Sequence, residues 1–230
     1  MDAFILAGGK GSRLRPYTTV LPKPLMPLGD RPILDILLRQ LQRNGFRSIA
    51  ISTGYLATLI EAFVEAENYE DVEIQFVKEE VALGTAGPLQ LLPTINSPFV
   101  MLNGDILADF DFDAFLETHK RSNNLITVGV YERVGVIPLG VLSLNEDGGI
   151  IGYKEKPKIK NFVSMGIYAL SPEIMEYVTV GERLDMPDLI TMLIKSGQNV
   201  GSYFHKGLWL DIGNHEDYAK AQDNVDDHLP

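Results

Sequence analysis

Apolar and polar positions change along the chain in blocks that predict strands and helices in alternation. Residues 3–6 form a short, uninterrupted apolar run directly at the N-terminus, which is typical of a buried strand. Residues 32–42 carry apolar side chains at helical spacing, with Asp30 as the predicted cap and Asn44-Gly45 as the predicted end. The first two predicted elements are therefore a strand and a helix.

The same patterning continues over the rest of the chain. It predicts further strands at residues 48–52, 72–77, 99–102, 126–131, 164–170, 200–204 and 208–212. It predicts further helices at residues 57–65, 112–120, 172–177, 186–195 and 215–224, a short helix after the loop at 82–87, and a hairpin of residues 140–144 and 150–153 around an Asp-Gly turn. Such alternation favours a Rossmann-like α/β fold, with a mixed, mostly parallel sheet and helices on both faces. We expect a single domain over residues 1–230, because no repeat or linker interrupts the pattern.

Composition and charge exclude several classes of function. The chain has 230 residues and no cysteine, so disulfides, thiolate metal sites and a cysteine nucleophile are excluded. Its net charge of -11 argues against general binding of nucleic acids, whose phosphates attract cations. No apolar run is long enough to span a membrane, and the N-terminus lacks the pattern of a secretory leader. We expect a cytoplasmic protein without a membrane or nucleic-acid partner.

A glycine-rich, locally basic stretch follows the first predicted strand. Ligands of parallel sheets bind beyond the carboxyl ends of the strands, so this position is a candidate site. Gly8, Gly9 and Gly11 allow the backbone N–H groups to approach a ligand closely, and Arg13 and Lys23 suit phosphate oxygens. The spacing matches neither the dinucleotide-binding fingerprint nor a Walker loop. The prolines that follow predict an irregular loop rather than a helix.

The stretch LAGGKGSRL at residues 6–14, followed by LPKP at residues 21–24, resembles the signature of the sugar-1-phosphate nucleotidyltransferases. Downstream, LGTAG at 83–87, NGD at 103–105, EKP at 155–157 and WLDIG at 209–213 resemble further motifs of this family. The likeness is greatest to guanylyltransferases of the mannose-1-phosphate type. It implies the nucleotidyltransferase fold and a catalytic domain alone, without the C-terminal β-helix or regulatory domain of many relatives.

The resemblance implies a role for each matching residue. Arg13, Lys23 and Lys156 would be catalytic, and Asp105 and Asp211 would bind Mg²⁺ as the cofactor. The residues expected at the nucleotide are Leu6, Ala7, Gly8, Gly9, Gly11, Glu79, Glu80, Gly84 and Thr85. Those expected at the sugar phosphate are Asn103, Gly140, Glu155, Lys156 and Gly166. For Gly166 a bulge in a strand is an equally simple explanation.

The implied chemistry explains the need for cations. A sugar 1-phosphate attacks the α-phosphorus of a nucleoside triphosphate and expels pyrophosphate, so two polyanions must meet and positive charge must offset their repulsion. A sugar phosphate is already ionised near neutral pH, so no general base is needed. We therefore expect ordinary packing or surface roles for the four histidines, His119, His205, His215 and His228.

The acidic pair before the LGTAG loop predicts which nucleobase of the triphosphate is preferred. Guanine presents two adjacent donors, which match the two oxygens of a carboxylate, whereas uracil and thymine suit an amide. Lys78 is followed by Glu79 and Glu80, five and four residues ahead of Gly84. We expect GTP to be preferred over UTP and dTTP, with Glu79 favoured over Glu80; a uridylyl- or thymidylyltransferase is the alternative.

A glycosyltransferase and a non-catalytic regulatory subunit are the alternative classes of function. A glycosyltransferase of a related fold would use a D-x-D metal motif, and Asp109-Phe110-Asp111 has that spacing, although these residues are explained more simply as a turn and a helix cap. A non-catalytic regulatory subunit would be expected to lose the arginine, the lysine or a metal aspartate. This chain keeps all of them. The expected partners are a nucleoside triphosphate and a sugar 1-phosphate, and a homo-oligomer is left open.

Overall fold

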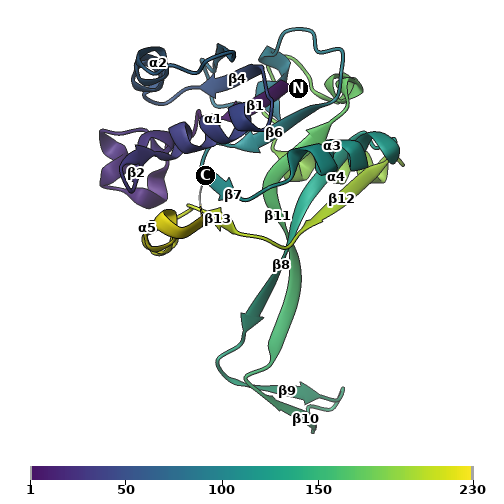
Figure 1. The fold of residues 1–230 in the computed structure, drawn as a ribbon. Helices are drawn as coiled ribbons and strands as arrows, with labels where there is room; N and C mark the ends of the chain where they lie inside the picture. The colour runs from purple at the N-terminus through teal and green to yellow at the C-terminus, as the bar shows by residue number, and fades with distance from the viewer. Residues whose placement is uncertain (1, 229–230) are drawn as a thin grey trace.

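A seven-stranded sheet forms the centre of the protein (Figure 1), with the strand order β12-β8-β11-β6-β1-β4-β5. The computed structural model describes residues 2–228, and side chains up to residue 223. The strands are β1 (Asp2–Leu6), β4 (Ser48–Thr53), β5 (Glu73–Lys78), β6 (Phe99–Asn103), β8 (Ile126–Val136), β11 (Lys158–Leu170) and β12 (Val200–His205). β1 pairs in parallel with β4 and β6, whereas β11 runs antiparallel to β6 and β8. The predicted fold class, a mixed and mostly parallel sheet, is confirmed.

Helices cover both faces of this sheet. They are α1 (Ile33–Arg43), α2 (Ala57–Ala66), α3 (Phe112–Arg121), α4 (Met186–Lys195) and α5 (His215–His228), with 3-10 turns η4 (Gly87–Leu91) and η5 (Pro172–Tyr177). Successive residues of a strand point to opposite faces, so Ile5 packs with α1, α2 and α3 while Phe4 packs with α4 and η5. The order of the helices along the chain thus follows the predicted pattern.

The start of α1 differs from the prediction. Asp30 does not cap the helix, because Pro32 occupies the capping position and no side chain accepts a hydrogen bond there. Pro32 and Arg31 instead form the strand β3 (Arg31–Pro32), which pairs with β2 (Pro27–Leu28). The end agrees with the prediction: Asn44 is the C-cap, and Gly45 follows with a left-handed φ of 79°.

A third cluster of buried side chains fixes the loops around the carboxyl end of β1. Leu14 and Met26 from the loop after β1 pack with Ile33 of α1, and with Leu107 and Ile212. Leu107 lies in β7 (Ile106–Ala108), and Ile212 directly follows β13 (Trp209–Asp211); these two short strands pair antiparallel. This cluster joins segments that lie about two hundred residues apart in the sequence.

The strands β8 and β11 extend well beyond their predicted ends. The predicted strands 126–131 and 164–170 account for the part inside the sheet, and the ladder continues outward to the pair of Val136 with Lys158. The predicted hairpin is present as β9 (Gly140–Leu144) and β10 (Ile150–Glu155), at the far end of this ribbon (Figure 1). We call residues 132–162 the arm.

His119 is a buried structural histidine, and it gives the fold a pH dependence. Its Nε2 contacts Ser171 Oγ at 3.0 Å and its Nδ1 contacts Thr127 Oγ1 at 2.9 Å. Ser171 Oγ donates its own hydrogen to the Asn124 carbonyl, so Nε2 carries a hydrogen and donates it to Ser171 Oγ. Burial lowers the pKa of His119 from 6.5 to about 4. His119 thus packs rather than catalyses.

We expect stability to fall as the pH drops from 6.5 to 4, because the unfolded chain then binds a proton at His119 that the folded protein excludes. The loss amounts to about 3 kcal/mol. Urea unfolding at a series of pH values measures it. His119→Gln keeps a donor and an acceptor but cannot titrate, and it should flatten this part of the profile. An unchanged slope in that variant would contradict the assignment.

Candidate active site

The segment after β1 folds into three short 3-10 turns in place of the predicted irregular loop: Ser12–Leu14, Tyr17–Thr19 and Lys23–Leu25. Gly11 begins the first turn with a left-handed φ of 57°, and its carbonyl accepts a hydrogen bond from the Thr18 hydroxyl at 2.8 Å. A Cβ at Gly11 would lie 3.0 Å from side-chain carbons of both Thr18 and Lys23. Gly11 thus lets the segment fold back until Lys23 packs directly against Gly11.

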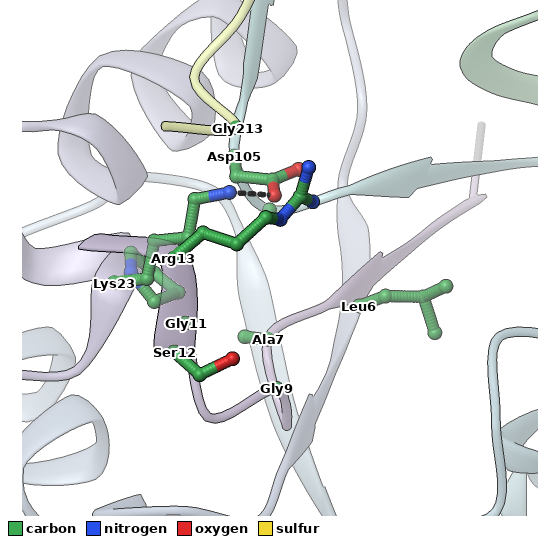
Figure 2. Close-up of a pocket in the computed structure, with 11 residues that line it drawn as sticks. Leu6, Ala7, Gly9, Gly11, Ser12, Arg13, Lys23, Asp105 and Gly213 are labelled. Carbon is green, nitrogen blue, oxygen red and sulfur yellow. Dashed lines mark hydrogen bonds and ion pairs between the residues drawn. The ribbon is translucent and has the colours of Figure 1, made fainter. Parts of the chain in front are cut away.

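A cavity of about 250 Å³ opens at the carboxyl end of β1 (Figure 2). It is lined by Leu6, Ala7, Gly9, Gly11, Ser12, Arg13, Lys23, Pro24, Gly104, Asp105 and Gly213. Figure 2 shows the side chains of Arg13 and Lys23 directed toward the carboxylate of Asp105. Seven of the predicted site residues therefore share this cavity, at the edge of the sheet where the sequence predicted a ligand.

Lys23 is buried, which is unusual for a lysine. Only 7% of the residue is exposed, and its Nζ forms an ion pair with Asp105. A buried charge is costly unless it is paired, so Asp105 keeps the ammonium ion in the cavity in the ligand-free protein. A phosphate oxygen entering the cavity can take over the same role.

Asp105 and Asp211 meet although 106 positions separate them in the numbering. The backbone N–H of Ile212 donates to the carbonyl of Asp105 at 3.0 Å, and Asp211 is in register with Ile106 on the paired strands. Partial burial raises the pKa of the Asp211 carboxyl, and the charge of Asp105 raises it further. Lys23 and Arg13 oppose this shift. The two carboxylates thus repel each other, which a bound cation would relieve.

Asp105 and Asp211 together supply two carboxylates as candidate metal ligands. In the described part of the chain, no three histidine, cysteine, aspartate or glutamate side chains group together in a way that could hold a metal ion. Two carboxylates fit a hard divalent cation such as Mg²⁺, which keeps several waters and takes further oxygens from substrate phosphates. Asp105 and Asp211 could therefore hold a metal jointly with a bound triphosphate.

Glu79 lies against the glycine-rich segment, whereas Glu80 is exposed. A Cβ at Gly8 would lie 2.5 Å from Glu79 Oε1, which also accepts a hydrogen bond from the Ser52 hydroxyl. The other carboxylate oxygen accepts from the backbone N–H of Leu83 at 3.1 Å. Each carboxylate oxygen has a second lone pair, so both remain able to accept from a ligand. Glu79 is thus placed between the glycine-rich segment and the loop that follows β5.

Gly84 and Thr85 contact the start of α4 and do not line the cavity. The Thr85 hydroxyl accepts from the N–H of Met186 at 2.7 Å, and the Thr85 N–H donates to Asp185 at 3.1 Å. A Cβ at Gly84 would lie 2.5 Å from the Leu184 carbonyl oxygen. These contacts anchor the loop 83–87 to the second face of the sheet, and the predicted nucleotide contact remains a prediction.

Asn103 and Gly166 lie together at the same edge of the sheet. Asn103 ends β6 in register with Leu6, which lines the cavity. Gly166 has a φ of 75° at an irregularity of β11, and a Cβ there would lie 2.5 Å from the Asn103 amide nitrogen. The strand irregularity that was the alternative explanation for Gly166 is therefore present, and it brings β11 close to Asn103.

The other predicted sugar-phosphate residues lie on the arm. Glu155, Lys156 and Gly140 are all exposed, and Gly140 pairs with Glu155 across the hairpin. The Tyr153 hydroxyl donates to Glu155 at 2.8 Å and occupies the space beside Gly140. The structure does not bring these residues to the cavity of their own chain, and their role stays a prediction.

A second cavity of about 210 Å³ lies at the root of the arm and reaches Asp211. It is lined by Tyr131, Arg133, Trp209, Leu210, Asp211, Asp217 and Lys220. Sequence reasoning did not select Arg133, because it follows the predicted end of a strand and belongs to no motif. Trp209 lines this cavity and also packs on Tyr131, with ring centroids 5.3 Å apart.

The residues of the rival metal motif lie apart from the first cavity. Asp111 caps α3 by accepting from the N–H of Ala114 at 2.9 Å, as predicted. Asp109 contacts His205 at 3.0 Å, and Phe110 is buried. His215 Nε2 lies 2.8 Å from the Arg15 carbonyl oxygen, while the side chain of His228 lies outside the described residues. The D-x-D motif of a glycosyltransferase is therefore not supported.

A comparison with known protein families decides where the chain belongs. The family described as Nucleotidyl transferase matches residues 2–228. The chain belongs to this family. The resemblance stated from the motifs is thus confirmed.

Nucleotidyl transferases with curated names cover nearly the whole chain. The UTP–glucose-1-phosphate uridylyltransferase of Synechocystis sp. is 32% identical over 96% of this chain and 62% of its own length. The mannose-1-phosphate guanyltransferase of Emericella nidulans is 32% identical over 95% of this chain and 62% of its own length. The chain therefore spans about three fifths of these relatives.

Two solved structures share the fold of this chain. A putative glucose-1-phosphate thymidylyltransferase from Bacillus anthracis superposes with a TM-score of 0.79 at 24% identity, covering 100% of this chain and 97% of the other. HddC from Yersinia pseudotuberculosis, complexed with GMP-PN, superposes with a TM-score of 0.74 at 26% identity, covering 97% and 99%. The nucleotidyltransferase fold predicted from the motifs is confirmed.

Proposed function

We propose that this protein transfers a nucleoside monophosphate from a nucleoside triphosphate, GTP in preference, to a sugar 1-phosphate of the mannose type. The observation that carries the proposal is the convergence of Arg13, Lys23 and Asp105 in a cavity at the carboxyl end of β1 (Figure 2). Family membership supports the reaction class. A regulatory subunit without activity is disfavoured, because Arg13, Lys23 and both aspartates are present and lie near one another.

The reaction requires cations and no proton transfer from the protein. An oxygen of the sugar phosphate forms a new bond to the α-phosphorus, and the bond from that phosphorus to the pyrophosphate oxygen breaks. Arg13 would bind the triphosphate and stabilise the leaving pyrophosphate with its planar donors. Lys23, released from Asp105, would neutralise charge on the α-phosphate.

Asp105 and Asp211 would hold Mg²⁺ together with phosphate oxygens. The ion would supply positive charge that stabilises the developing negative charge on the phosphates. The raised pKa of Asp211 supports this assignment, since two neighbouring carboxylates are more stable with a cation between them.

The sugar 1-phosphate would bind beyond Asp211. The second cavity adjoins that residue and offers Arg133 and Trp209 as walls, while Asn103 and Gly166 lie at the same edge of the sheet. Glu155 would accept hydrogen bonds from sugar hydroxyls and Lys156 would bind the sugar phosphate, once both are brought to a cavity. A release assay for pyrophosphate, with five triphosphates against a panel of sugar 1-phosphates and Mg²⁺, tests the reaction and identifies the sugar.

The preference for GTP rests on Glu79. This carboxylate lies beside Gly8 and retains lone pairs for the two adjacent donors of guanine. The relatives do not decide the base, because one is named for UTP and another for guanylyl transfer. The complex of HddC with GMP-PN is consistent with guanine. A uridylyl- or thymidylyltransferase is the alternative.

We expect GTP to be used roughly ten- to a hundredfold better than UTP or dTTP, because a matched pair of hydrogen bonds is at stake. Glu79→Gln should erode this ratio. Because Glu79 also accepts hydrogen bonds from Ser52 and Leu83, the thermal midpoint of the variant must be measured together with kcat/KM. Glu80→Gln is the matched control, because Glu80 is exposed. Equal use of UTP by the wild-type protein would favour the alternative.

A further inference from the structure

The arm, residues 132–162, leaves the body beside the second cavity, which Tyr131 and Arg133 line. β12 accompanies β8 only as far as the pair of His205 with Tyr131, and beyond it β8 pairs with β11 alone. At the usual rise of a strand, the ribbon from Tyr131 to Val136 is about 17 Å long. Lys156 lies beyond the end of this ribbon, between the hairpin strand β10 and the start of β11. The four-carbon side chain of Lys156 cannot span the way back to its own cavities.

The surface of the arm is apolar to a degree found nowhere else on the described residues. Ten of the eighteen strongly exposed large apolar side chains lie on it. Leu139 and Ile151 are each 69% exposed, Ile150 is 67% exposed and Phe162 is 65% exposed. Exposed apolar surface of this extent marks an interaction site in a stable protein.

The arm also lacks internal support. Its hairpin strands β9 and β10 pair only with each other, and its ribbon is two strands wide. Isolated two-stranded sheets are marginal in water, because neither face is covered and both edges are open. A partner that covers these faces would hold the arm in place.

The charge of the arm favours a second copy of this chain as that partner. The chain as a whole has 31 acidic and 20 basic side chains, whereas the arm has four acidic and five basic ones. Four lysines cluster at its turn into β11: Lys154, Lys156, Lys158 and Lys160. An apolar arm that carries this cluster of four lysines thus complements the acidic body of another copy.

The incomplete site points to the same partner. Under the proposed function, the sugar phosphate needs Lys156, and this residue is missing from the cavities of its own chain. The second cavity lies at the root of the arm, beside Tyr131 and Arg133. Two copies related by a two-fold axis near these roots would each extend an arm across the other's cavity.

We therefore propose that two copies of this chain exchange arms, and that Lys156 of each copy binds the sugar phosphate in the active site of the other. The proposal rests on the proposed function for the identity of the ligand. Each active site would then combine Arg13, Lys23, Asp105 and Asp211 from one copy with Lys156 from the second.

Light scattering after gel filtration tests the association. We expect the wild-type protein to be a dimer at micromolar concentration. The double variant Leu139→Glu/Ile151→Glu should be monomeric and should lose at least about tenfold in turnover. Val180→Glu is the matched control, because Val180 is 83% exposed and lies outside the arm; it should stay dimeric and active. A monomeric, active wild-type protein would overturn the proposal.

Complementation tests the exchange itself. Arg13→Ala and Lys156→Ala are co-expressed with two different affinity tags, and the heterodimer is isolated with both tags in turn. Each variant alone should be nearly inactive. The heterodimer has one site with Arg13 from one chain and Lys156 from the other, so it should recover about half of the wild-type turnover.

The outcomes separate this proposal from the proposed function. An inactive heterodimer beside an active wild-type protein would show that Lys156 acts within its own chain, and would overturn the exchange. Full activity of Lys156→Ala would also overturn it, and would point to Arg133 as the phosphate ligand. A wild-type protein that releases no pyrophosphate from any substrate pair would instead contradict the proposed function.

Discussion

Arg13→Ala is expected to lower kcat/KM by about a hundredfold or more, because one group that stabilises developing phosphate charge is lost. Arg13 lines the cavity with its guanidinium directed toward Asp105 (Figure 2), and its side chain is exposed to solvent. Substitution of an exposed polar residue changes the free energy of unfolding by about 0.5 kcal/mol or less. The variant should therefore fold normally and fail in turnover. Steady-state kinetics with thermal denaturation measures both.

Two further variants separate charge from geometry at this position. Arg13→Lys keeps the positive charge but loses the planar pair of donors, so we expect an intermediate loss. Arg15→Ala removes a nearby exposed arginine that does not line the cavity, and it should keep normal turnover. If Arg13→Ala kept more than half of the wild-type turnover, the assigned role would be wrong.

The body of the fold could be predicted because its periodicities are local. Strand 99–102 is apolar throughout and is buried on both faces, and the helix at 112–120 has its apolar side chains on one face and Asp111 as its cap. Capping by Asp30 failed as a prediction, because Asp30 lies in the turn between the two-residue strands β2 and β3, and the helix begins only at Ile33. The preference of an aspartate for a helix cap is weak, and the surrounding structure can override it.

The hairpin of the arm was predicted, but the two-stranded ribbon that carries it could not be predicted from the same rules. Residues 132–136 and 158–163 lack the pattern of a half-buried strand, since alternate positions do not face a core. Their pairing depends on a ladder that begins inside the sheet at Ile126 and Leu170 and simply continues outward. Apolar and polar residues alternate along a strand when one of its faces is buried. Neither face of the ribbon is buried within one chain, so its sequence does not show this alternation.

The candidate site was predicted in its residue types but not in its contacts. The motif around Arg13 and the motif around Asp105 each indicate phosphate and metal chemistry. The ion pair of Asp105 with Lys23 connects the two motifs. The spacing of residues within one motif cannot predict a contact with the other. Ser12, Gly104 and Gly213 line the cavity from within the quoted motifs, so the signal for them was present.

Asp105→Asn and Asp211→Asn are each expected to lower turnover by on the order of a hundredfold or more at ordinary Mg²⁺, because a carboxylate ligand of the cation is lost. Their effects on stability should differ. Asp105→Asn leaves the buried Lys23 without its counter-ion, which should cost about 1–3 kcal/mol in a cavity that admits water. Excess Mg²⁺ or Mn²⁺ is expected to restore part of the turnover.

Asp211→Asn should lose turnover without losing stability. The pKa of Asp211 is raised in the folded protein, so its ionised form is less favourable there than in the unfolded chain, and its charge opposes folding at neutral pH. In a chelating buffer at pH 7, the thermal midpoint of Asp211→Asn should equal or exceed that of the wild-type protein.

When Mg²⁺ and a triphosphate are added, the thermal midpoint of the wild-type protein should rise above that of Asp211→Asn. The ligands stabilise the folded wild-type protein by mass action, whereas the variant has lost half of the carboxylate pair and should gain little. The midpoint thus reports binding independently of turnover. A wild-type protein that stays fully active in a chelator, or an Asp211→Asn variant that gains as much from Mg²⁺ as the wild-type protein, would contradict the metal assignment.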